Sequence, residues 1–134
     1  MTPEEFDAMV AEALQRIAPR FRRRLANIAI VVEPEPSAAQ LARGRAGRGS
    51  TLLGLYEGRP LTQRSVFEAF ALPDRITIFQ GPHERLAVSR EHLQQLVNET
   101  VWHEVAHYFG LNEREVRAAE RRHRGAAQRR PKRA

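Results

Sequence analysis

Apolar residues recur at helical spacing near the N-terminus of the chain. The segment begins at Thr2-Pro3-Glu4-Glu5, where Thr2 is suited to cap a helix and Pro3 to occupy its first turn. Glu5 completes a capping box with Thr2. We therefore predict an amphipathic helix that covers a core and is ended by Pro19; its apolar positions are Phe6, Val10, Ala13, Leu14 and Ile17.

A second helical pattern follows Ser89, which is suited to cap it, with Val88 and Leu93 placed as a hydrophobic staple. Its apolar positions cover more than one face, which predicts that the later half is buried. Gly110 can adopt the left-handed conformation that ends a helix. A final short helix is predicted from Glu113 to about Arg122. The apolar positions of the long helix are Leu93, Leu96, Val97, Val101, Trp102, Val105, Ala106 and Phe109.

Three apolar runs between these helices predict strands. Residues 26–32 are rich in β-branched side chains and are followed by Glu33-Pro34-Glu35-Pro36. Residues 52–56 form the second run, and residues 75–80 alternate in character before Gly81-Pro82. Residues 34–50, with two prolines and three glycines, and residues 61–73 are expected to be loops.

Length and composition place the chain among single-domain proteins. Its 134 residues, 42% of them hydrophobic, suffice for one core. No apolar run approaches a membrane span, and the first five residues are acidic where a signal peptide would be basic, so a cytoplasmic location is expected. The chain contains no cysteine, and any zinc site must therefore use His, Glu or Asp.

The net charge of +6 is concentrated at the C-terminus. Residues 121–134 contain seven Arg or Lys and no acid, whereas the rest of the chain has 15 basic and 16 acidic residues. We therefore expect a near-neutral domain over residues 1–120 and a basic, disordered tail over residues 121–134. A solubilising role for this tail is favoured over a contact with nucleic acid or an acidic partner.

The long helix carries the residues that can do chemistry, His103-Glu104-Val105-Ala106-His107, in the pattern H-E-x-x-H. Two imidazoles four residues apart lie on one face of a helix and can bind one zinc ion. Glu104, between them, is placed to act as a general base on water. The competing interpretation is a helix whose histidine face is simply exposed to solvent. The apolar surroundings favour the metal, because unpaired buried imidazoles would be costly.

A third zinc ligand is expected after the helix, where Gly110 lets the chain turn back. Glu113 is the favoured residue, and Glu115 and Asn112 are alternatives. The remaining histidines, His83, His92 and His123, are predicted to be surface residues. Tyr56 and Tyr108 are the tyrosines available to stabilise an oxyanion, and neither is preferred.

The stretch His103 to Glu113 reads H-E-x-x-H-x-x-G-x-x-E and resembles the zincin metallopeptidases, most of all a small bacterial zincin-like family. The resemblance covers about residues 2–120. It is supported by the segments Leu53-Gly54-Leu55-Tyr56-Glu57-Gly58, Leu72-Pro73-Asp74-Arg75-Ile76-Thr77-Ile78-Phe79 and Val101-Trp102-His103-Glu104-Val105-Ala106-His107-Tyr108-Phe109-Gly110.

This resemblance implies a minimal α+β zincin domain, with a short mixed β-sheet packed on the motif helix and an N-terminal helix. It implies one zinc ion bound by His103, His107 and Glu113, with Glu104 as the base. An edge strand beside the motif helix commonly binds an extended peptide in zincins, and residues 75–80 are the candidate. The chain departs from the metzincins, because Glu113 stands where they have His and no methionine follows the motif.

Two functions follow from these observations. The first is a zinc-dependent peptidase that hydrolyses peptide bonds in a peptide or protein substrate. The second is a non-catalytic, zinc-stabilised module that binds peptides or proteins. The intact Glu104 favours the peptidase, because a purely structural site has no use for a base; the small size of the chain favours the binding module.

Overall fold

The computed structural model describes residues 1–25, 28–44, 51–58, 74–110, 114 and 118. Its N-terminal helix begins where the sequence predicts. Helix α1 spans Pro3–Gln15. The Thr2 hydroxyl accepts from the Glu5 amide at 3.1 Å, and the Thr2 amide donates to the Glu5 carboxylate at 3.2 Å. Pro19 does not end this helix; it begins a separate short helix α2, Pro19–Arg22, which leads into the 3-10 helix η1, Arg23–Leu25.

The sheet has three strands in the order β1-β3-β2: β1 Ile28–Glu33, β2 Gly54–Glu57 and β3 Asp74–Phe79. β1 pairs with β3 in parallel, and β2 pairs with β3 antiparallel. The prediction that residues 75–80 form the edge strand is therefore wrong, because β3 is the central strand. β3 is buried at five of its six positions, which is typical of a strand paired on both sides.

Two short helices occupy segments for which the sequence predicted loops or turns. Helix α3, Ala38–Gly44, begins with a reciprocal cap, in which the Gln40 amide donates to the Ser37 hydroxyl and the Ser37 amide donates to the Gln40 side chain. Helix α4, Gln80–Leu86, contains the Gly81-Pro82 pair and follows β3 directly. Ser37-Ala38-Ala39-Gln40 is a capping-box sequence, so a local signal for α3 was present.

The long helix α5 spans Arg90–Tyr108, and the Ser89 side chain accepts from the His92 amide, as predicted for its cap. The predicted staple is wrong, because Val88 is 86% exposed. Gly110 has a φ of 74°, the left-handed conformation expected where the helix ends. The short helix predicted over residues 113–122 and the basic tail lie outside the described residues, apart from residues 114 and 118.

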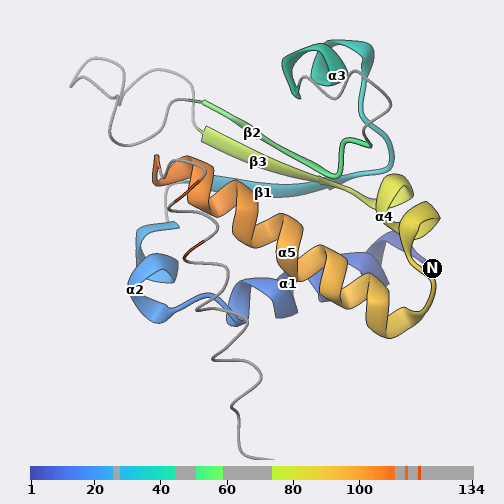
Figure 1. Ribbon diagram of the computed structural model, residues 1–134, viewed down its shortest axis with the longest axis horizontal. Helices are drawn as coiled ribbons and strands as arrows, with labels where there is room; N and C mark the ends of the chain where they lie inside the picture. The colour runs from blue at the N-terminus through green and yellow to red at the C-terminus, as the bar shows by residue number, and fades with distance from the viewer. Residues whose placement is uncertain (26–27, 45–50, 59–73, 111–113, 115–117, 119–134) are drawn as a thin grey trace, which may run out of the picture.

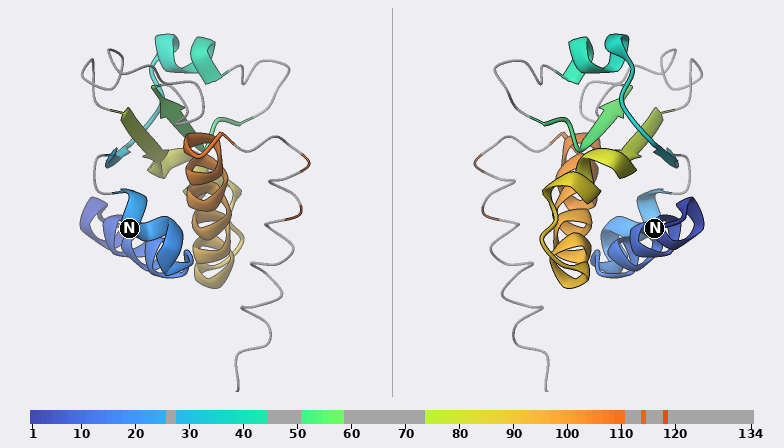
Figure 2. Two further views of the ribbon diagram at one scale, coloured as in Figure 1. Left: turned by 90° about the vertical axis from the view of Figure 1, so that its left-hand side faces the viewer. Right: turned by 90° about the vertical axis from the view of Figure 1, so that its right-hand side faces the viewer.

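Helices α1 and α5 lie side by side beneath the sheet, and α3 lies at its opposite side (Figure 1; Figure 2). The core between α1, α5 and the sheet is built from apolar side chains, including Phe6, Ile76, Val97, Val101 and Val105. The molecule is thus an α+β domain whose sheet rests on α5. Over the described part of the chain, no helix is long and apolar enough to cross a membrane.

Candidate metal centre

Helix α5 brings His103, Glu104 and His107 together at its C-terminal half. One potential ligand atom from each of these side chains lies within 4.8 Å of the other two. The imidazole rings have centroids 4.3 Å apart, and the nearer Glu104 carboxylate oxygen is 3.6 Å from His107 Nδ1. The three residues lie together because their spacing is fixed by one helix.

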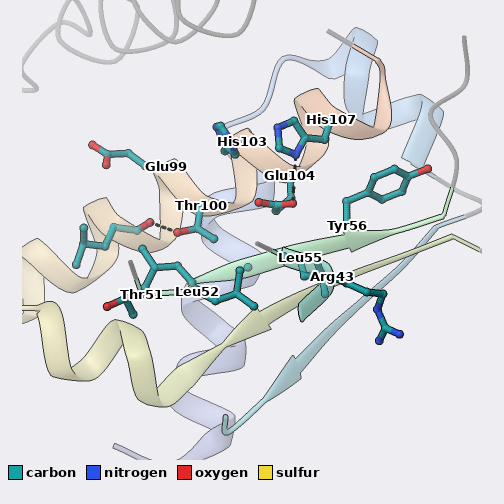
Figure 3. Close-up of a pocket in the computed structure, with 14 residues that line it drawn as sticks. Arg43, Thr51, Leu52, Leu55, Tyr56, Glu99, Thr100, His103, Glu104 and His107 are labelled. Atoms are coloured by element: carbon teal, nitrogen blue, oxygen red, sulfur yellow. Dashed lines mark hydrogen bonds and ion pairs between the residues drawn. The ribbon is translucent and has the colours of Figure 1, made fainter. Parts of the chain in front are cut away.

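The three side chains differ in their exposure to solvent. Glu104 is buried, whereas His103 and His107 are half-buried. The Glu104 carboxylate lies between α5 and β2, with the imidazoles above it (Figure 3). An ion could therefore approach the imidazoles from solvent, while the carboxylate remains held between two elements.

Strand β2 passes very close to α5 at Gly54. A Cβ atom at this position would lie 2.7 Å from Thr100 Cγ2, 3.2 Å from Glu104 Cγ and 3.3 Å from the Thr77 carbonyl oxygen. Real Cβ atoms essentially never approach another heavy atom to 2.7 Å. Glycine is thus required for β2 to reach the backbone position that borders Glu104.

A cleft of about 580 Å³ opens along α5 and the edge of β2 and contains the cluster. Clefts of this volume are of the size that binds small molecules or peptide side chains. The lining residues come from α3, from the segment leading into β2, from β2 itself and from α5 (Figure 3). They are Arg43, Gly44, Thr51, Leu52, Leu53, Gly54, Leu55, Tyr56, Leu96, Glu99, Thr100, His103, Glu104 and His107.

The donor set of the cluster fits a divalent metal. The imidazole nitrogens of His103 and His107 are ligands that zinc prefers, and the chain has no thiol to compete with them. The candidates for a third ligand, Glu113, Glu115 and Asn112, lie outside the described residues. Within the described residues, the arrangement provides two adjacent imidazoles and a buried carboxylate in an open cleft.

The prediction that His83 is a surface residue is wrong, because this residue is fully buried. Its Nδ1 lies 2.7 Å from the Phe79 carbonyl oxygen, and its Nε2 lies 2.8 Å from the Thr100 hydroxyl. Because a carbonyl oxygen can only accept, Nδ1 carries a proton in this arrangement. Burial lowers the pKa of His83 below its usual value, and this outweighs the rise caused by the backbone carbonyls of Phe79 and Leu96.

The other two histidines outside the motif do not join the cluster in the described residues. His92 is half-buried at the start of α5, where its Nδ1 accepts from the Val88 amide at 3.0 Å. His123 lies outside the described residues. No periodicity signalled the buried position of His83, since helix α4 itself was not predicted.

The two tyrosines have different surroundings. Tyr108 is 3% exposed and packs in the core, with its ring edge-on to that of Tyr56 at 5.8 Å. Tyr56 lines the cleft, and its hydroxyl donates to the buried carboxylate of Asp74 at 3.1 Å. Tyr56 is therefore the tyrosine that borders the candidate site.

A polar network that the sequence did not reveal anchors α3 beside the cleft. The Glu57 carboxylate, at the end of β2, forms ion pairs with Arg43 at 2.6 Å and Arg75 at 2.9 Å. Partial burial raises the pKa of Glu57, but these arginines and a hydrogen bond from Gln40 outweigh it and hold the pKa below its usual value. The network joins α3, β2 and β3, and so fixes one wall of the cleft.

An H-E-x-x-H helix beneath a small mixed sheet, with an antiparallel edge strand bordering the motif, defines the zincin class of architecture. The sequence profile of a family described as zincin-like metallopeptidase matches residues 25–123. The chain belongs to this family, as its motifs suggested.

Comparison with solved structures supports the same fold. A conserved hypothetical protein from Thermus thermophilus is similar, with a TM-score of 0.55 and 24% sequence identity over 90% of this chain and 99% of that chain. At this identity the similarity concerns the fold alone. No curated protein sequence matches the chain.

Proposed function

We propose that the protein is a zinc-dependent peptidase in which His103 and His107 bind the metal and Glu104 is the general base. The observation that carries the proposal is the cluster of two imidazoles and a buried carboxylate in an open cleft. Glu113 is the proposed third ligand, with Glu115 and Asn112 as alternatives. Family membership supports a metal-dependent hydrolase.

The edge strand supports a peptide as the substrate. β2 pairs with β3 on one side and borders the cleft on the other. An extended peptide can add to such an edge by backbone hydrogen bonds, which hold it in place whatever its sequence. The peptide-binding strand is therefore β2, and not residues 75–80.

Each proposed residue has one task in the reaction. Zinc, when bound, would act as a Lewis acid that activates water and polarises the scissile carbonyl. Glu104 accepts the proton of the attacking water and then delivers it to the leaving amine nitrogen. The buried position of Glu104, beside Gly54 and Thr100, limits the directions in which this carboxylate can turn.

Substitution Glu104→Gln tests the base. Removal of the proton acceptor is expected to lower peptide hydrolysis by about 10²- to 10⁴-fold, while one zinc ion per chain remains bound. Zinc is measured by elemental analysis and hydrolysis with a peptide library. The double variant His103→Ala/His107→Ala is the control and is expected to lose both zinc and hydrolysis.

The same variant separates the peptidase from a non-catalytic binding module. A binding module would keep its zinc and its peptide affinity in Glu104→Gln, and its wild-type form would cleave no peptide. Wild-type protein that takes up no zinc, even when zinc is supplied, would contradict both functions.

A further inference from the structure

The cleft carries two leucines, Leu52 and Leu96, at the end that lies away from the candidate metal site, and the exposed Glu99 also lines it. Leu96, Thr100, His103 and His107 are spaced by four, three and four residues and therefore lie along one stripe of α5. Leu96 is half-buried and lines the cleft, seven residues before His103. At 1.5 Å per residue, this separation is about 10 Å along the helix axis.

Leu52 meets this end of the cleft from the opposite wall. It is half-buried, precedes β2 and lies below Thr100 in Figure 3. A Cβ atom on Gly44, the last residue of α3, would lie 2.7 Å from Leu52 Cδ1, so the end of α3 packs tightly against this leucine. Leu52 is thus supported by α3 on one side and lines the cleft on the other.

The direction of β2 determines which part of a bound peptide would lie at the end of the cleft that carries Leu52 and Leu96. Gly54 lies against Thr100 and Glu104, and the Tyr56 ring contacts that of Tyr108. β2 therefore runs along α5 in the same direction as the helix. A peptide paired antiparallel to β2 would run the opposite way, from the metal cluster towards Leu96.

The register of β2 identifies the backbone groups that such a peptide would meet. The Phe79 amide donates to the Leu53 carbonyl, and Gly54 is opposite Ile78. In an antiparallel pair the hydrogen-bonding residues alternate, so the backbone amide and carbonyl of Gly54 point away from β3. Gly54 also packs against Thr100 and Glu104, so this position on the edge lies beside the candidate metal site.

We propose that Leu52 and Leu96 form a subsite for an apolar side chain of the substrate, two or three residues to the C-terminal side of the scissile bond. The position follows from the separation of about 10 Å, because an extended peptide advances about 3.3 Å per residue. The antiparallel direction is the more stable way to extend the edge of a sheet. This subsite rests on the proposed peptidase function.

A library of unstructured 14-residue peptides, incubated with the full-length, zinc-supplemented protein, tests the subsite through cleavage sites mapped by mass spectrometry. Leu, Ile, Phe or Met at the second or third position after the cut is expected to raise kcat/KM by about 10- to 100-fold over Ser or Asn. Leu96→Glu is expected to replace this preference with one for Lys or Arg at the same position. A new preference of this kind cannot arise from unfolding.

The matched control is Leu86→Glu, since Leu86 is 45% exposed on α4 and does not line the cleft. It is expected to leave the cleavage preference unchanged. Leu96→Asn is a second, uncharged variant that is expected to lose the apolar preference without acquiring another. Zinc content and circular dichroism show that each variant is folded.

Two results would overturn the subsite alone: cleavage by the wild type without an apolar preference at these positions, or a preference that both Leu96 variants retain. A zinc-loaded wild type that cleaves no peptide would instead overturn the peptidase proposal, and the subsite with it.

Discussion

Gly54 matters for both the fold and the candidate site, because it has no Cβ atom. The absence of a side chain lets β2 approach α5, so that Thr100 and Glu104 pack directly against the strand backbone. Any larger residue would have to displace either the strand or the helix that carries the motif. The glycine thus helps to position the candidate site, although it has no functional group of its own.

Substitution Gly54→Ala is expected to destabilise the protein by about 1–3 kcal/mol, because the added methyl group overpacks the contact with Thr100. The free energy of unfolding in urea measures this loss. Thr100→Ser removes the Cγ2 methyl and retains the hydroxyl that contacts His83. The double variant Gly54→Ala/Thr100→Ser is expected to recover much of the loss; the absence of any recovery would show that this contact is not the cause.

Single substitutions can identify the third zinc ligand. If Glu113 completes the site, Glu113→Ala is expected to weaken zinc binding by at least about 10²-fold, since a zinc site with only two protein ligands is incomplete. Glu115→Ala and Asn112→Ala are the matched controls and are expected to bind zinc as the wild type does. Competition with a chromophoric chelator measures the affinities, and loss of zinc in either control would transfer the role to that residue.

At the scale of elements, α4 and α5 are tied together behind the cleft by His83. Its imidazole contacts the Phe79 carbonyl and the Thr100 hydroxyl, and the Thr100 hydroxyl oxygen also lies 2.9 Å from the Leu96 carbonyl oxygen within α5. Thr100 also lines the cleft, one helical turn before Glu104. This buried histidine therefore supports the part of α5 that forms the floor of the candidate site.

Burial lowers the pKa of His83 in the folded protein, whereas the unfolded chain has the ordinary value near 6.5. Below that value the unfolded state binds more protons, so the stability contributed by the neutral imidazole is present above pH 6.5 and is lost as the pH falls below it. The loss is expected to reach at most about 1.4 kcal/mol per pH unit.

Measurement of the free energy of unfolding between pH 7.5 and pH 5 tests this expectation. His83→Gln is expected to show a flatter dependence on pH than the wild type. His92→Gln is the control, since His92 is only half-buried, and it should follow the wild-type curve. Parallel curves for wild type and His83→Gln would show that His83 does not cause the dependence.

At the scale of the whole molecule, the candidate metal site, formed by His103, Glu104 and His107, lies on the helix that also forms the centre of the core. Helix α5 contributes Val97, Val101 and Val105 to that core and carries His103 and His107 at its surface. A ligand that binds only the folded state stabilises the whole domain. Zinc binding and global stability are therefore expected to be coupled.

Zinc at 100 times its dissociation constant is expected to stabilise the protein by about 2.7 kcal/mol, which corresponds to a rise in Tm of roughly 5–15 °C. Calorimetry of the metal-free protein with and without added zinc measures the rise. The double variant His103→Ala/His107→Ala is expected to melt at the same temperature in both conditions. A rise of equal size in that variant would place the zinc elsewhere.

The sequence by itself determined the features that depend on neighbours within a few residues. The capping box at Thr2, the cap at Ser89 and the left-handed Gly110 are local, and so is the spacing that places His103 and His107 on one face of a helix. The family resemblance was confirmed for the same reason, because it rests on short contiguous motifs. The cap at Ser37 is equally local, but the prolines and glycines around it favour the prediction of a loop.

Only the tertiary structure decided which distant segments meet. The alternating pattern of residues 75–80 could not reveal that β3 lies between β1 and β2, because strand order depends on where the rest of the chain runs. His83 is buried by Phe79 and Thr100, and Gly54 is required by a helix that is far away in the sequence. Such contacts are fixed by the packing of whole elements against each other, which no short stretch of sequence encodes.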